Sequence, residues 1–237
     1  MTLFADGFEA SRAWRGSLGV EKRLTQLFRL TIEGSFSRGV RQSGFRDLNL
    51  VSAPRFTIAS EGDRPVYVAP GDITATTGAP RFNASRADSA FGQVLEAQSN
   101  LRSRSVQVTV GIGGLVLRRG IQMQTSYTWQ RTQDQATGSR GGSTAGDPSV
   151  VEWARSDFER RHSFLATLTY PFSQSLEITS IGRLTSGSPY TPTVGGDVNG
   201  DGSRNDRAFV FAPGAATPEA AGMQRLLTQS SPQVREC

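Results

Sequence analysis

The sequence predicts an all-β fold of about six antiparallel, up-and-down strands. Three observations support this fold. Apolar and polar residues alternate with period two in six segments, the pattern of strands whose two faces meet different surroundings. The segments come in pairs joined by turns of about two to four residues. Connections between the pairs are far longer and rich in Gly, Ser, Asp and Pro.

The first predicted hairpin covers about residues 13–41. It reads as two alternating stretches separated by a break near 24–27. The even positions are apolar or small and the odd positions are mostly polar, so one face is apolar throughout. The apolar side chains of that face are Trp14, Leu18, Val20, Phe28, Leu30, Ile32 and Phe36.

The second and third predicted hairpins cover about residues 101–132 and 161–186. The clearest alternation in the chain follows the turn at 117–120, where Ile121, Met123, Tyr127 and Trp129 alternate with Gln122, Gln124, Ser126 and Thr128. The last strand is the weakest, because Ile181 falls among its polar positions.

The long connections, residues 42–100, 133–160 and 187–237, favour part of a transmembrane β-barrel over a soluble sandwich. A sandwich would explain the strands and their aromatics. It would not explain long loops alternating with tight turns, nor a polar strand face suited to a water-filled lumen. Because the smallest single-chain barrels have about eight strands, we expect this chain to be a segment of a larger barrel. The long loops are expected to be extracellular, and the tight turns at 25–26, 118–119 and 174 periplasmic.

Charge and composition argue against several other classes. The net charge is +5, but the 25 Arg and the single Lys never run beyond two in succession, unlike a nucleic-acid footprint. One His and one Cys make a zinc site or a thiol–imidazole catalytic pair improbable. Composition alone leaves catalysis by carboxylates open. With the barrel interpretation, we expect that the protein is not an enzyme, that it has no catalytic or cofactor-binding residues, and that it has no nucleic-acid partner.

One segment carries possible metal chemistry. Asp197, Asn199 and Asp201 occupy the first, third and fifth positions of a calcium-loop pattern. The twelfth position is Ala208 rather than Glu, so Asn205 and Asp206 or backbone carbonyls would have to complete a site. A possible extracellular Ca²⁺ site is one interpretation, and an Asx-rich turn held by side-chain to backbone hydrogen bonds is the other.

Two further motifs flank the third hairpin. The segment 156–162, Ser-Asp-Phe-Glu-Arg-Arg-His, is interpreted as an ion-paired strand entry rather than an acid–base cluster, because nothing places a nucleophile near His162. The segment 186–192, Ser-Gly-Ser-Pro-Tyr-Thr-Pro, has the composition of a turn.

Together these motifs resemble the carboxy-terminal half of TonB-dependent outer-membrane receptors of the Oar-like type. The resemblance rests on Trp153 and on the segments 156–162, 186–191, 197–202 and 205–207. It implies a barrel of about 22 strands in the outer membrane of a Gram-negative-type bacterium, which takes up or exports a substrate. The implied partners are outer-membrane lipid, the remaining barrel and plug, and an energy-coupling inner-membrane complex.

The chain ends bear on the same expectation. Residues 1–15 lack the pattern of a secretory signal, and the lone Cys237 is the final residue. We expect the plug, the remaining strands and a partner for Cys237 to belong to a longer protein. The alternative from another class is a secreted calcium-dependent β-sheet binding or adhesion module.

Overall fold

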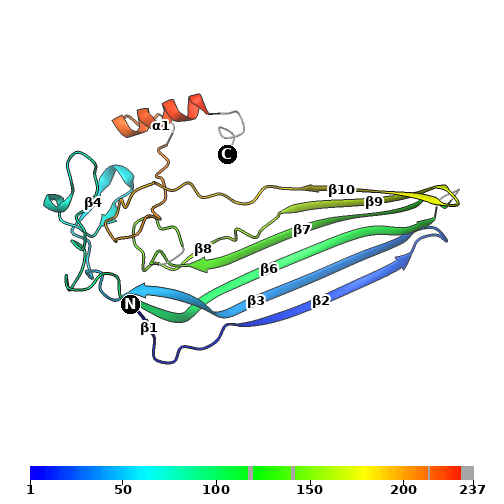
Figure 1. Ribbon diagram of the computed structural model, residues 1–237, viewed down its shortest axis with the longest axis horizontal. Helices are drawn as coiled ribbons and strands as arrows, with labels where there is room; N and C mark the ends of the chain where they lie inside the picture. The colour runs from blue at the N-terminus through cyan, green and yellow to red at the C-terminus, as the bar shows by residue number, and fades with distance from the viewer. Residues whose placement is uncertain (117–119, 140–141, 213, 231–237) are drawn as a thin grey trace.

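The computed structural model describes residues 1–116, 120–139, 142–212 and 214–230 (Figure 1). Its strands are β1 (Thr2–Phe4), β2 (Arg12–Arg23), β3 (Arg29–Asp47), β4 (Phe56–Ile58), β5 (Arg64–Val66), β6 (Leu95–Val116), β7 (Gln122–Ala136), β8 (Glu152–Arg155), β9 (His162–Ser173) and β10 (Leu176–Thr185). Short 3-10 turns η1 (Ala59–Glu61) and η2 (Pro70–Asp72) and one helix, α1 (Pro218–Gln229), complete the elements.

Six long strands form one twisted sheet in the order β10-β9-β7-β6-β3-β2. All five contacts along this path are antiparallel, which confirms the predicted all-β fold of up-and-down strands. The β2–β3 and β9–β10 turns lie at one end of the sheet, and the long connections gather at the other (Figure 1). The predicted turn at Arg118–Arg119 lies outside the described residues.

Three strands run further than the alternation predicts. Residues 133–136 of β7 fall within the predicted loop 133–160, and residues 42–47 of β3 and 95–100 of β6 fall within the predicted loop 42–100, yet all belong to the sheet. The register between β3 and β6 shifts twice, between Gly39 and Gln42 and between Gln42 and Gly44. Arg41 has a φ of 56° at this point. Such bulges break the period of two, so a pattern search loses the strand there.

Two short strands add to the sheet at the loop end. The alternation in the sequence predicts neither strand. β1 pairs with β6 in parallel, and β8 pairs with the last four residues of β7, beyond the end of β9. Both are short additions beside long strands, and neither changes the six-stranded path.

The pairing register places unlike residues on the two faces of the sheet. Directly paired residues of neighbouring strands point to the same side. One row that crosses all six strands is wholly apolar: Val20, Ile32, Val110, Tyr127, Phe164 and Leu184. The adjacent row on the opposite side carries no apolar side chain: Gly19, Glu33, Thr109, Thr128, Ser163 and Thr185.

The apolar face is uncovered, and the buried core lies elsewhere. Leu18 and Leu184 on this face are 76% and 72% exposed. Buried apolar residues instead gather where loops pack at the strand ends, among them Val66, Val68 and Leu101. In water such a face would be unfavourable, whereas hydrocarbon would match it.

The two edges of the sheet are open. Within the described part of the chain, β2 pairs only with β3 and β10 pairs only with β9. The sheet is therefore not closed. Among the described residues, no helix combines the length and apolar character needed to cross a membrane.

Candidate functional site in the loop cluster

The candidate site residues are brought together where the chain returns after β10. Residues 193–207 pack against residues 64–68 and 137–148, which belong to the two preceding long connections. Asn199, Asp201 and Asp206 are buried, with exposures of 0%, 2% and 0%. Three polar side chains of one short segment thus form the centre of the loop cluster, and Asp197 and Asn205 of the same segment lie half-buried beside them.

The first half of this segment is held by its own side chains. The carboxylate of Asp197 accepts the backbone N–H groups of Gly200 at 2.7 Å and Gly202 at 2.8 Å. Both glycines have positive φ, 72° and 87°, a conformation that favours glycine. The side-chain oxygen of Asn199 accepts the N–H of Asp201 at 3.0 Å. These are the contacts of Asx turns.

The second half joins the segment to the other loops. Asp206 accepts the N–H of Val198 at 2.7 Å and lies 3.3 Å from the Arg64 guanidinium. Asn199 donates to the carbonyl of Gly146 at 2.7 Å. Asn205 donates to the carbonyl of Gly138 at 2.6 Å, and its own Oδ1 is buried and has no hydrogen-bond partner among the described residues. The segment therefore connects three loops.

These contacts bear on the predicted calcium site. The Asp197 carboxylate oxygens each accept a backbone N–H, as does Oδ1 of Asp201 from Ser203 at 2.7 Å. Among the described residues, no group of three or more His, Cys, Asp or Glu side chains has the arrangement of a metal site. The contacts are those that the Asx-turn interpretation requires, and calcium binding through Asp197, Asn199, Asp201, Asn205 and Asp206 stays a prediction.

Burial also changes the acidity of the segment. Desolvation raises the pKa of Asp201 to about 6, against the opposing hydrogen bonds from Asn199 and Ser203. Desolvation likewise raises the pKa values of Asp197 and Asp206, although each accepts two backbone N–H groups. The cluster therefore holds three carboxyl groups that ionise less readily than in water.

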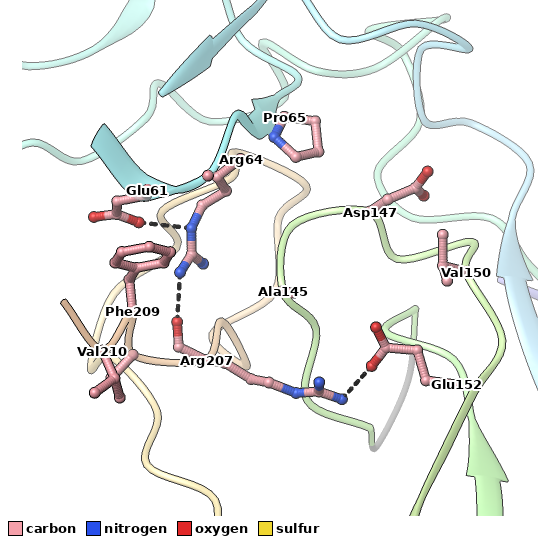
Figure 2. A pocket seen from close by; sticks show the side chains of 12 residues that line it. Glu61, Arg64, Pro65, Ala145, Asp147, Val150, Glu152, Arg207, Phe209 and Val210 are labelled. Carbon is pink, nitrogen blue, oxygen red and sulfur yellow. Dashed lines mark hydrogen bonds and ion pairs between the residues drawn. The ribbon is translucent and has the colours of Figure 1, made fainter. Parts of the chain in front are cut away.

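Two buried arginines, neither of them predicted from the sequence, hold the cluster together. Arg64 lies 2.7 Å from the Glu61 carboxylate and donates to the carbonyl of Arg207 at 2.6 Å (Figure 2). Arg86 pairs with Asp47 at the end of β3 and donates to the carbonyl of Asp201 at 2.6 Å. Their partners lie between 39 and 143 residues away, except Glu61, so no local pattern marks them.

A pocket of about 460 Å³ opens beside Arg64 (Figure 2). Pro65, Phe209 and Val210 supply apolar walls. Arg207, which also lines it, lies 2.5 Å from the Glu152 carboxylate. Because both arginines of the pocket are already ion-paired, its charges serve to join loops.

The motif 156–162 forms a clamp in the sheet, which we call the Glu159 clamp. Glu159 is 0% exposed; one of its carboxylate oxygens accepts the N–H of Thr132 on β7 at 2.8 Å. The other contacts Arg155 at 2.7 Å and Arg161 at 2.8 Å. The carboxylate thus bridges the gap along β7 between its partners β8 and β9. Burial opposes ionisation, but these three donors outweigh it and lower the Glu159 pKa.

His162 lies next to this clamp, and its side chain contacts β7 rather than a residue of the segment 156–162. Its Nδ1 is 2.7 Å from the Tyr127 hydroxyl, and its backbone N–H donates to the Ser186 hydroxyl at 3.1 Å. Ser186 in turn donates its N–H to the His162 carbonyl at 2.8 Å. The segments 156–162 and 186–192 therefore meet at the loop ends of β9 and β10.

The comparisons agree with this geometry. Residues 3–231 match the family model described as an outer membrane beta barrel domain. No curated protein and no solved structure matches the chain. A sheet with one apolar face, one polar face and all long loops at one end is the wall that such a domain requires. The chain belongs to the outer membrane β-barrel domain family, and its place is the cell outer membrane.

Proposed function

We propose that the chain forms part of the wall of a TonB-dependent receptor barrel of the Oar-like type, which moves a substrate across the outer membrane. The observation that carries the proposal is the cross-strand register. It puts a wholly apolar row and a neighbouring row without apolar side chains on opposite sides of the same six strands. The first side suits lipid and the second suits a water-filled lumen.

The open edges support a larger barrel. In hydrocarbon each unsatisfied backbone N–H or C=O costs several kcal/mol, so an edge strand cannot stay unpaired there. β2 has 12 residues and β10 has 10, and their outer edges need further strands. Those strands, together with a plug inside the lumen, are the partners in this proposal, along with the surrounding outer-membrane lipid.

The receptor assignment is supported by the motifs that resemble Oar-like barrels. Residues 156–162 form the Glu159 clamp, and residues 197–207 tie three loops together at the same end. A loop cluster of this kind gives a barrel a shaped mouth at which a substrate is recognised. The wall itself needs no catalytic group, so we propose no enzymatic activity. The family match gives no support to a secreted calcium-dependent adhesion module.

The wall is tested by labelling single cysteines in a Cys237→Ser background. Ser126 and Tyr127 are neighbours on β7 with opposite orientations. In the complete barrel, with the plug removed by denaturant, Ser126→Cys should react with a water-soluble maleimide and Tyr127→Cys should stay protected by lipid. Equal reactivity would contradict the water-filled lumen.

The energy coupling needs a separate test. The complete protein should bind the carboxy-terminal domain of TonB in a pull-down, and deletion of its plug should abolish that binding. If the complete protein shows the predicted cysteine labelling but does not bind this domain, the barrel wall is supported and the TonB-dependent receptor is refuted.

A further inference from the structure

Three arginines lie on the apolar face near its loop end. They are Arg38 on β3, Arg104 on β6 and Arg131 on β7, and all three are exposed. Arg38 pairs directly with Arg104, and Arg131 pairs with Val106, two residues from Arg104. Side chains two positions apart on a strand share a face, so the three guanidinium groups project from the same side. We call them the arginine triad.

The positive charge of the triad is not compensated within the described part of the chain. None of the ion pairs between described residues includes Arg38, Arg104 or Arg131. The one hydrogen bond that the Arg104 guanidinium donates to another described residue goes to the neutral Gln133 side chain, at 3.0 Å. Like charges directly opposite each other destabilise a sheet, so an anion bound between Arg38 and Arg104 would offset this destabilisation.

Each arginine of the triad has a tryptophan beside it. Trp14 pairs directly with Arg38. The guanidinium carbon of Arg104 lies 4.7 Å from the ring centre of Trp153. Trp129 precedes Arg131 by two residues on the same face. These are all three tryptophans of the chain.

The tryptophans indicate the depth at which the triad lies. Trp is enriched where the hydrocarbon of a membrane meets its headgroups. Below the triad along β3 and β6 come Phe36, Ile32 and Val110, which match hydrocarbon. The triad is therefore at headgroup depth, where the phosphate groups of lipids lie.

We propose that the arginine triad binds the phosphate group of a membrane lipid at the loop end of the barrel wall. A guanidinium binds phosphate oxygens through two parallel hydrogen bonds, and one phosphate between Arg38 and Arg104 would neutralise both. This inference rests on the wall facing lipid and not on coupling to TonB. Nor does it depend on which leaflet surrounds the loop end.

The three tryptophans provide the test. The complete barrel, with every tryptophan outside this chain changed to phenylalanine, is reconstituted in phosphatidylcholine vesicles. These contain either phosphatidic acid or phosphatidylcholine with brominated acyl chains, which quench tryptophan on contact. For the natural sequence, phosphatidic acid should be preferred by at least about fivefold, equivalent to about 1 kcal/mol. Arg38→Gln together with Arg131→Gln should reduce the preference to about one, because surface basic residues supply the attraction.

A matched control removes the same charge from the other face. Arg15 on β2 and Arg183 on β10 lie on the polar side, paired with Ser37 and Leu165. Arg15→Gln with Arg183→Gln should keep the preference. If the Arg38 and Arg131 double variant does not insert, Arg→Lys changes at the same positions keep the charge and should weaken the preference without abolishing it.

Three outcomes with the brominated lipids would overturn the proposal. These are equal quenching by both brominated lipids in the natural sequence, an unchanged preference in the Arg38 and Arg131 variants, and an equal loss in the control. Inorganic phosphate distinguishes a lipid from a free anion. If millimolar inorganic phosphate abolishes the preference while sodium chloride at the same ionic strength does not, the ligand is the free anion and the lipid site is refuted.

Discussion

A charge placed on the lipid-facing side of β6 should be far more costly than the same charge one residue away. Val108 lies on the apolar face and Thr109 on the polar face. The comparison of Val108→Arg with Thr109→Arg keeps the strand, the depth and the added side chain nearly constant. Only the face changes, so the difference in folding free energy measures what each face contacts.

The magnitude follows from the position of Val108. It lies four residues from Arg104 of the triad and four from Ile112, near the turn end. At about 3.3 Å per residue, each distance is about 13 Å along the strand, or about 9 Å of depth at a tilt of about 45°. Val108 is thus near the middle of the apolar band, where an added Arg costs roughly 2–4 kcal/mol. That is about a 30- to 700-fold change in the folding equilibrium.

Thr109→Arg should cost much less. Its hydroxyl lies 3.0 Å from that of Thr128, and a neutral hydrogen bond of this kind contributes about 1 kcal/mol. Met123→Arg and Gln124→Arg give a second pair on opposite faces of β7. Because Met123 lies near the turn end, where the added charge can reach the interface, their difference should be smaller than at Val108.

The assay is heat-modifiable gel mobility together with urea titration of the complete barrel refolded in lipid vesicles. Val108→Arg should lower the folded fraction and the urea midpoint, while Thr109→Arg stays close to the natural sequence. Equal losses at both positions would refute the assignment of the two faces. A greater loss at Thr109 would reverse it.

Four further predictions concern the loop end and the orientation. Glu159→Gln should destabilise the refolded barrel by about 2–4 kcal/mol, because it leaves two partly exposed arginines unpaired beside a buried site; a urea midpoint unchanged from the natural sequence would contradict the clamp. The folded pKa of Asp201, about 6, lies above its ordinary 3.8, so its contribution to stability is complete below about pH 4 and declines as pH rises through 6. Asp201→Asn should therefore flatten the pH dependence of the loop's protection from proteolysis between pH 4 and 7, and an unaltered pH profile would refute this expectation. If the predicted cation site exists, calcium should protect the natural loop more than it protects the variant. Equal protection would refute the cation site. Epitope tags inserted after Ala75 and after Gln174 should be reached by antibody on whole cells at Ala75 only, and labelling at Gln174 alone would invert the orientation.

The sequence by itself determined which side chains share a face. Strand side chains alternate strictly, so the identities of Ile121 to Trp129 are sufficient to separate an apolar from a polar side. The contrast between short turns and long loops also indicated a barrel wall, because the number of residues between strands can be counted from the sequence alone. The alternation did not predict the continuation of β3 where its period of two is interrupted, at the bulges near Gly39 and Gln42.

Only the tertiary structure decided which residues meet. Arg64 and Asp206 are 142 residues apart, and their pairing depends on how two long loops pack. The arginine triad likewise depends on register, because a slip of one residue would move Arg104 to the other face and away from Arg38. Alternation is a local property of the backbone, whereas register and loop packing are set by contacts between distant segments. A single sequence read in order does not contain those contacts.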